Sequence, residues 1–127
     1  MELGRPEEAL PLHRELLPYL VARATGADAK AEELSLAASI LLTIEDESLR
    51  DPERALGFAE RSCALLEESH PGPLWSYLPV LVEAQYETGD TEAAIENLRR
   101  SLSLMPEGAD SNVAERLADF EAARKGE

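Results

Sequence analysis

One seven-residue pattern occurs three times in this chain, and it constrains the fold more than any other feature. The copies read GRPEEAL at 4–10, RDPERAL at 50–56 and GDTEAAI at 89–95. In each copy the third residue is proline or threonine, the fourth is glutamate, the sixth is alanine and the seventh is aliphatic. Proline suits the first position of a helix, and acids in the first turn suit the helix dipole. Each copy therefore predicts the start of a helix.

The residues around these copies predict helices on both sides of a tight turn. The glycines that open two of the copies, Gly4 and Gly89, suit the C-cap of an earlier helix. Apolar residues recur at helical spacing on both sides of the third copy, at Leu74, Leu78, Leu81, Val82, Ala94, Ile95, Leu98, Leu102 and Leu104. Pro106 then stops the second helix. We expect the shared alanines Ala9, Ala55 and Ala94 to allow close helix crossings.

This pattern resembles a tetratricopeptide repeat, a helical hairpin of about 34 residues. The resemblance is carried by the leucine, alanine and tyrosine spacing before GD, then by A-I, L, L and P, within residues 73–106. The middle copy carries a long turn, TIEDESLRDP, and the alanine spacings of 46 (55 − 9) and 39 (94 − 55) both exceed 34. The stretch LLT…LRDPERAL is similar to repeats attached to large bacterial signalling proteins, including some serine/threonine kinases.

The resemblance implies one all-α domain over 1–127, a right-handed α-solenoid of antiparallel helix pairs. We expect an incomplete first repeat at 1–24, a second repeat with the long turn at 30–68, a third at 73–106 and a capping helix at 111–125. Pro11 and Pro18 should kink or break the first helix. Asn112 and Glu115 are spaced as a capping box, and the apolar residues of the last helix fall on one face, at Val113, Leu117 and Phe120.

Composition narrows the classes of partner. The chain has 12 basic and 26 acidic residues, a net charge of −14, and 5% aromatic residues. Such a charge repels nucleic acid and anionic membranes and favours cationic or apolar partners. The longest apolar run, 36–44, is about half the ~20 residues that a membrane span needs, and no signal peptide is visible. We therefore expect a cytoplasmic protein.

Few residues suggest catalysis or metal binding. Cys63 is the single cysteine, so it can form no internal disulfide, and its apolar neighbours suggest burial. His13 and His70 are the only histidines, and neither has a partner spaced for nucleophilic or zinc chemistry. The acidic run at 45–48 lacks the calcium-loop pattern. We expect no catalytic, cofactor-binding or metal-binding residue.

The resemblance also implies a binding surface. In these repeats the first helix of each pair lines a concave groove that accepts an extended peptide or a partner's helix. In the third repeat the outward positions are Ser76, Pro79, Glu83, Tyr86 and Glu87, and in the second they are Ala38, Leu41 and Leu42. Chaperone-adaptor repeats grip a terminal carboxylate with basic and amide groups, whereas this chain offers Pro79 and Glu83 at those positions. Trp75 suits either packing or a partner anchor.

Three functional hypotheses remain open. The first is a protein-interaction scaffold without catalytic activity, whose groove binds a basic or apolar peptide or helix. The second is a structural C-terminal segment of a larger enzyme, such as a bacterial signalling kinase. In that case the uncovered face at 9–21, with Leu12, Leu16 and Tyr19, packs on the parent chain or self-associates. From the incomplete first repeat we expect either that the array continues before Met1 or that another surface covers residues 9–21. The third is an enzyme whose site the sequence does not reveal.

Overall fold

The computed structural model describes residues 6–69, 72–108 and 113–125, and side chains within these segments from Glu15 to Ala123. All regular secondary structure in these segments is helical, which confirms the all-α class. The elements are α1 (Pro6–Thr25), α2 (Ala31–Thr43), a 3-10 turn η1 (Glu47–Leu49), α3 (Pro52–Ser69), α4 (Leu74–Glu87), α5 (Thr91–Leu104) and α6 (Val113–Lys125). Calls on the side chains of Ala9, Leu12 and His13, and on Gly4, His70 and Asn112, lie outside the described residues.

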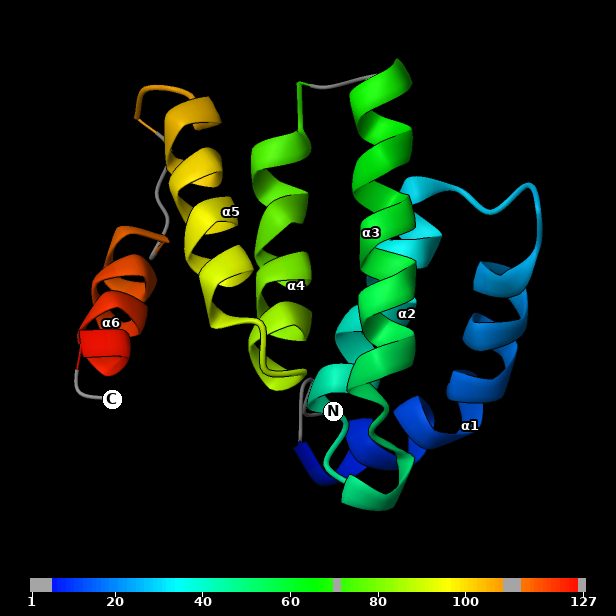
Figure 1. Ribbon diagram of the computed structural model, residues 1–127. Coiled ribbons are helices and arrows are strands. Elements are labelled where there is room, and N and C mark those ends of the chain that lie inside the picture. Colours follow the sequence, from blue (N-terminus) through cyan, green and yellow to red (C-terminus); the bar gives the residue numbers. More distant parts are fainter. Residues whose placement is uncertain (1–5, 70–71, 109–112, 126–127) are drawn as a thin grey trace.

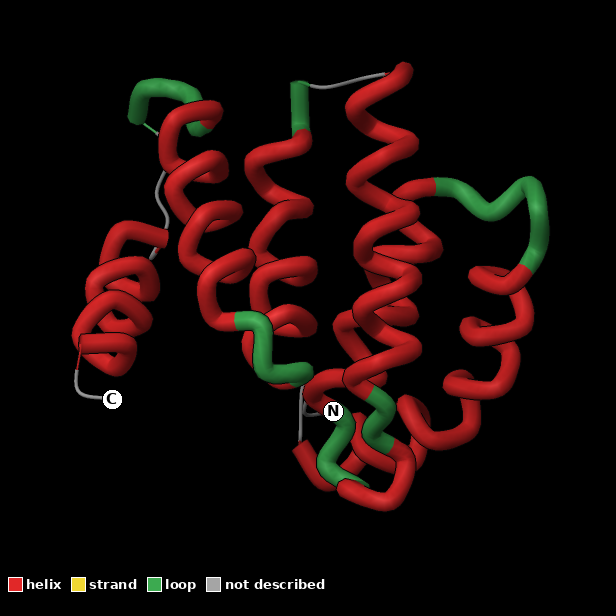
Figure 2. The backbone as a smooth tube through the Cα atoms, in the orientation of Figure 1, coloured by secondary structure: helices red, strands yellow, loops and turns green. Residues whose placement is uncertain are grey.

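The helices pack in chain order. Each helix contacts the next one along the chain, and α2 also contacts α4. Figure 1 shows α3, α4, α5 and α6 following one another across the molecule, with α1 at the opposite edge from α6. The longest connections are those between α2 and α3, which contains η1, and between α5 and α6, each eight residues long (44–51 and 105–112). Figure 2 shows the loop at 44–51 beside the first turn of α3. No helix in the described segments is long and apolar enough to cross a membrane.

The repeated motif starts helices as its residues predict. Pro52 is the first residue of α3 and Thr91 is the first residue of α5. Asp90 caps α5, because its Oδ1 accepts a hydrogen bond from the Ala93 amide at 3.2 Å. Gly89 has a φ of 94°, the left-handed conformation expected of a C-cap glycine.

Small residues let the helices approach closely. Ala55 and Ala94 have no exposed surface, as expected for alanines at helix crossings. Many other core residues are also alanines, including Ala31, Ala37, Ala38, Ala59 and Ala84. A larger side chain at one of these crossings is costly, because protein interiors are packed at crystal-like density and have no room for it.

Two buried serines link the helix pairs in the same way. Ser62 Oγ of α3 donates a 2.8 Å hydrogen bond to the Ala31 carbonyl at the start of α2. Ser101 Oγ of α5 donates a 2.7 Å hydrogen bond to the Trp75 carbonyl at the start of α4. The two serines are 39 residues apart, which is also the distance from Ala55 to Ala94. The α2–α3 and α4–α5 pairs therefore share one cross-helix bond at matching positions.

Helix α1 runs unbroken through Pro11 and Pro18. The prolines therefore do not break it, and Figure 1 shows that its axis changes direction along its length, as expected where backbone donors are missing. Arg61 of α3 secures the end of α1 by donating three hydrogen bonds, of 2.9 to 3.1 Å, to the carbonyls of Ala24, Gly26 and Ala27. The bond to Ala24 satisfies a carbonyl in the last turn of α1, where helical donors are missing, and the other two bonds hold the loop that follows.

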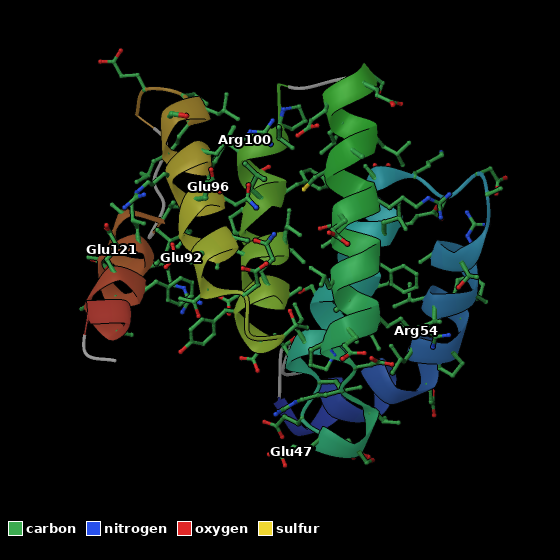
Figure 3. All side chains as sticks on the ribbon, viewed as in Figure 1. Glu47, Arg54, Glu92, Glu96, Arg100 and Glu121 are labelled. Atoms are coloured by element: carbon green, nitrogen blue, oxygen red, sulfur yellow. The ribbon has the colours of Figure 1, made fainter. Side chains whose placement is uncertain are left out.

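Helix α6 packs inward through the apolar residues that the sequence places on one of its faces. Val113 and Phe120 are buried and Leu117 is half-buried, all against a cluster that includes Val82 and Leu98. Two surface ion pairs link α5 to other helices. Arg99 of α5 pairs with Glu121 of α6, and Arg100 of α5 pairs with Glu67 of α3, each at 2.7 Å. Figure 3 labels Arg100 and Glu121 on their two helices.

Candidate interaction groove

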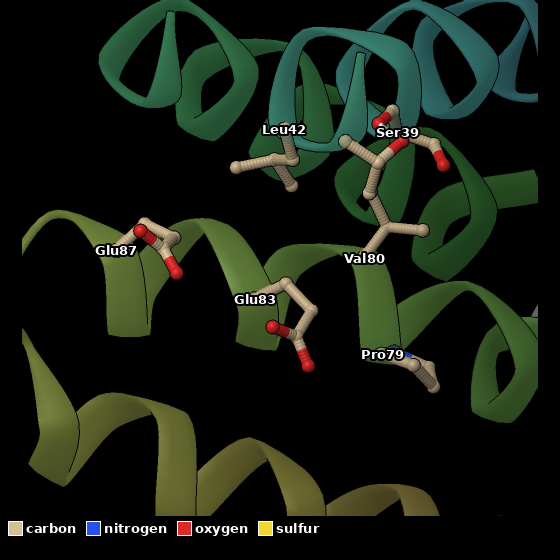
Figure 4. A pocket seen from close by; sticks show the side chains of 7 residues that line it. Ser39, Leu42, Pro79, Val80, Glu83 and Glu87 are labelled. Atoms are coloured by element: carbon tan, nitrogen blue, oxygen red, sulfur yellow. Dashed lines mark hydrogen bonds between the residues drawn. The ribbon is translucent and has the colours of Figure 1, made fainter. Parts of the chain in front are cut away.

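A cavity of about 230 Å³ lies between α2 and α4. It is lined by Ser39, Leu42, Thr43, Pro79, Val80, Glu83 and Glu87. Figure 4 shows Leu42 and Val80 between the two helices, with Glu83 and Glu87 spaced along α4. The cavity therefore combines an aliphatic floor with carboxylates on one side.

A second cavity of about 300 Å³ extends the first along the same two helices. Its lining residues are Glu32, Ser35, Leu36, Ser39, Ser76, Tyr77 and Val80. Because Ser39 and Val80 line both cavities, the two form one depression, which we call the α2–α4 groove. It spans Glu32 to Thr43 on α2, or about 16 Å at the helical rise. About five residues of an extended peptide cover that distance.

The charged side chains that line this groove are all acidic: Glu32, Glu83 and Glu87. Glu83 forms an ion pair with Arg116 of α6. The Arg116 guanidinium also lies over the Phe120 ring, 4.9 Å from its centroid. Helix α6 thus brings one cation to the edge of an otherwise acidic groove.

Most of the α4 residues expected in the groove are there. Pro79, Glu83 and Glu87 line the first cavity and Ser76 lines the second. Tyr86 lines neither cavity. Its ring stacks on Phe120 of α6, with centroids 4.6 Å apart and planes at 6°. Tyr86 is therefore placed to hold α6 against α4, although 40% of its surface is exposed.

The expectation for α2 is wrong in register. Leu41 is 3% exposed and Ala38 is fully buried, so both belong to the core and neither can contact a groove ligand. Leu42 alone of the three expected residues lines the groove. The face differs because α2 turns Leu41 toward α1 and the α2–α3 segment, where Leu41 lines a separate cavity together with Leu17 and Leu49.

A better alignment of the two helices was available in the sequence. Leu34 and Leu78 are both fully buried. When these two leucines are aligned, Ser35, Ser39 and Thr43 match the groove residues Pro79, Glu83 and Glu87. The long turn after α2 obscures this correspondence. It places α2 and α4 farther apart along the chain than α3 and α5 are, so the two pairs do not align at a single offset.

The alternative surface lies on α1. Leu16 is 40% exposed and Tyr19 is 61% exposed, whereas Leu17 between them is 7% exposed and joins the core. The side chain of Leu12 lies outside the description. The two described residues therefore do form an exposed apolar face, separate from the groove. Trp75 is half-buried and lines neither groove cavity.

The titratable groups of the described segments include no reactive cluster. No three histidine, cysteine or acidic side chains within those segments are placed to hold a metal ion. Burial raises the pKa of the Cys63 thiol to about 11, and nearby Glu67 adds to this effect. The thiol is therefore neutral at physiological pH. Glu33 caps α2, because its Oε1 accepts a 3.0 Å hydrogen bond from the Lys30 amide. This bond, and then Arg23, lowers the pKa of Glu33.

No protein-family model, curated protein or solved structure matches this chain. The class of protein must therefore be inferred from the helix arrangement and from the groove themselves.

Proposed function

We propose that this chain is a tetratricopeptide-type interaction module, a right-handed solenoid of antiparallel helix pairs with no catalytic activity of its own. Its role is to bind a segment of a partner protein in the α2–α4 groove. The observation that carries this proposal is that the groove is formed by α2 and α4, the first helices of the two complete pairs. That is the surface on which such repeats receive ligands.

The matching serine bonds support the repeat interpretation. Ser62 and Ser101 occupy equivalent positions in the two pairs, and each bonds the carbonyl of an early residue in the preceding helix. Two helix pairs that share apolar spacing, a crossing alanine and a buried polar link are best described as two copies of one unit.

The size and charge of the groove indicate the kind of ligand. The groove consists of two connected shallow cavities of about 230 and 300 Å³ along α2 and α4. A cavity of this size suits single side chains of a peptide or helix. Its acidic rim favours basic or apolar segments and disfavours nucleic acid, whose phosphates carry the same sign of charge.

A library of random heptapeptides displayed on phage and panned on the full chain tests this function. We expect enriched peptides that bind the wild type and lose binding to Leu42→Arg, which fills the groove with a charged side chain. Leu104→Arg is the control for the same substitution outside the groove, because Leu104 is a 46% exposed leucine at the end of α5. Enriched peptides that bind Leu42→Arg as well as wild type would place binding elsewhere.

The exposed face of α1 favours a second candidate function. Leu16 and Tyr19 present apolar surface without a described partner helix. A structural segment of a larger protein, such as a signalling kinase, would cover this face with the parent chain or with a second copy. Sedimentation of wild type against Leu16→Ser/Tyr19→Ser separates the cases. Association that disappears in the double variant supports the structural role, and identical monomeric behaviour counts against self-association.

A further inference from the structure

We propose that the segment bound in the α2–α4 groove presents a cationic side chain to Glu83 and Glu87 and an adjacent aliphatic side chain to Leu42 and Val80. We also propose that Arg116 of α6 competes with the ligand for Glu83. This inference rests on the proposed groove-binding function and specifies the ligand's chemistry.

The two carboxylates form a ready site for a cation. Glu83 and Glu87 are four residues apart on α4 and line the same cavity. Like charges at this spacing on a helix repel each other, so a cation placed between them relieves an unfavourable interaction. Glu83 pairs with Arg116, whereas no ion pair within the described segments includes Glu87. Glu87 is therefore available to a ligand without displacement of another group.

The aliphatic part of the site lies beside these carboxylates. Leu42 from α2 and Val80 from α4 lie between the helices, and Pro79 completes the apolar lining (Figure 4). An aliphatic side chain placed here loses contact with water against three apolar residues, which is favourable in proportion to the area buried. Glu83 lies one helical turn after Pro79 and Val80 on α4. The cation and the aliphatic side chain should therefore be neighbours in the ligand.

Helix α6 supplies the evidence that a guanidinium fits at this edge. Arg116 pairs with Glu83 and lies over Phe120, and Phe120 stacks on Tyr86 of α4. This arrangement holds an arginine against the first carboxylate even without a partner. A ligand cation must therefore share Glu83 with Arg116 or displace it, so Arg116 lowers the affinity of the groove for cationic segments.

The peptides enriched from the heptapeptide library are the probe. We expect arginine or lysine next to leucine, isoleucine or valine in the enriched sequences. A synthetic consensus peptide should bind Glu87→Gln about threefold more weakly than wild type, the size expected of an exposed ion pair. It should bind Arg116→Gln about twofold to threefold more tightly, and both effects should shrink in high salt. Glu96→Gln, an exposed glutamate on α5, is the control and should leave affinity unchanged.

The outcomes separate this inference from the function beneath it. Enriched peptides that lack cations, or that bind Glu87→Gln as tightly as wild type, would overturn the cation site. If those peptides still fail to bind Leu42→Arg, the groove function stands. Weaker binding to a folded Arg116→Gln, checked by circular dichroism, would overturn the competition. A library that yields no enriched peptide contradicts both the inference and the groove function.

Discussion

The hydroxyl of Ser101 donates a 2.7 Å hydrogen bond to the carbonyl of Trp75, and that carbonyl is one that Pro79 leaves without its helical donor. In an α-helix the carbonyl of residue 75 would accept from the amide of residue 79. Pro79 lies inside α4 and has no N–H. Ser101 therefore replaces a missing bond of α4 from the neighbouring helix. This explains how α4 tolerates a proline in the middle of the groove wall.

Removal of this hydroxyl should cost more than removal of its counterpart. Ser101→Ala leaves the Trp75 carbonyl without either donor, and we expect a loss of about 1–3 kcal/mol in the free energy of unfolding. Ser62→Ala should cost about 1 kcal/mol, because the Ala31 carbonyl keeps a possible helical donor, the amide of Ser35 four residues later. Urea unfolding measures both.

A double-mutant cycle isolates the role of Pro79. In a Pro79→Ala background the amide of residue 79 can bond the Trp75 carbonyl, so Ser101→Ala should become milder. Ser103→Ala, which removes only an exposed bond to the Arg100 carbonyl, serves as the control. An equal cost of Ser101→Ala in both backgrounds would show that the serine does not compensate for the proline.

Arg61 should decide how firmly α1 is attached. Arg61→Ala removes three hydrogen bonds to carbonyls at the end of α1 and in the loop that follows it. We expect the free energy of unfolding to fall by about 1.5–3 kcal/mol. Amide exchange should become faster in α1 but not in α5. Arg61→Lys should recover only part, because an ammonium cannot reproduce the planar fork of the guanidinium. Hydrogen exchange by mass spectrometry reads out both. Arg99→Ala, which breaks a surface ion pair, should cost less than about 1 kcal/mol.

The alanine at the α4–α5 crossing should not tolerate a charge. Ala94 is fully buried, so Ala94→Glu places an unpaired carboxylate in the core and should cost at least about 3 kcal/mol. Ala22→Glu is the matched control, because Ala22 is exposed on α1. It should change stability by about 0.5 kcal/mol or less. Thermal melts followed by circular dichroism measure both, and equal melting temperatures would contradict a close crossing at Ala94.

Cys63 should make stability fall at alkaline pH. Burial raises the pKa of its thiol from an ordinary value near 9.0 to about 11, so the folded chain holds the thiol proton more tightly than the unfolded chain does. The resulting stability is fully present below pH 9 and is lost as the pH rises toward 11. Wild type should therefore lose stability relative to Cys63→Ala across this window. A constant difference between the two from pH 8 to 11 would contradict the assignment.

The local signals of the sequence predict the structure correctly where one residue type determines the geometry. Gly89 and Pro52 mark a helix end and a helix start, and Ala94 marks a crossing, because each depends on backbone conformation or side-chain size alone. The prediction for the α2 side of the groove is wrong for Ala38 and Leu41, which are buried. Whether Leu41 or Leu42 faces outward depends on how α2 rotates against its neighbours, and the long turn concealed the alignment of Leu34 with Leu78.

Contacts between distant side chains were beyond the reach of spacing arguments. Tyr86 was expected to meet a ligand, but it stacks on Phe120, thirty-four residues later in the chain. No spacing in the sequence points to Arg116, although it pairs with Glu83. Both contacts depend on where α6 docks, which its amphipathic pattern does not specify. The one available signal for Ser101 was its 39-residue offset from Ser62, matching that of the two alanines.

The most direct test of the groove is to map where a selected peptide binds. Amide chemical-shift changes in the isotope-labelled full chain should concentrate on α2 and α4, at residues such as Ser39, Leu42, Val80 and Glu87. That result would place the ligand in the α2–α4 groove. Changes that concentrate around Leu16 and Tyr19 on α1 instead would contradict the groove account and favour a structural segment that packs through its first helix.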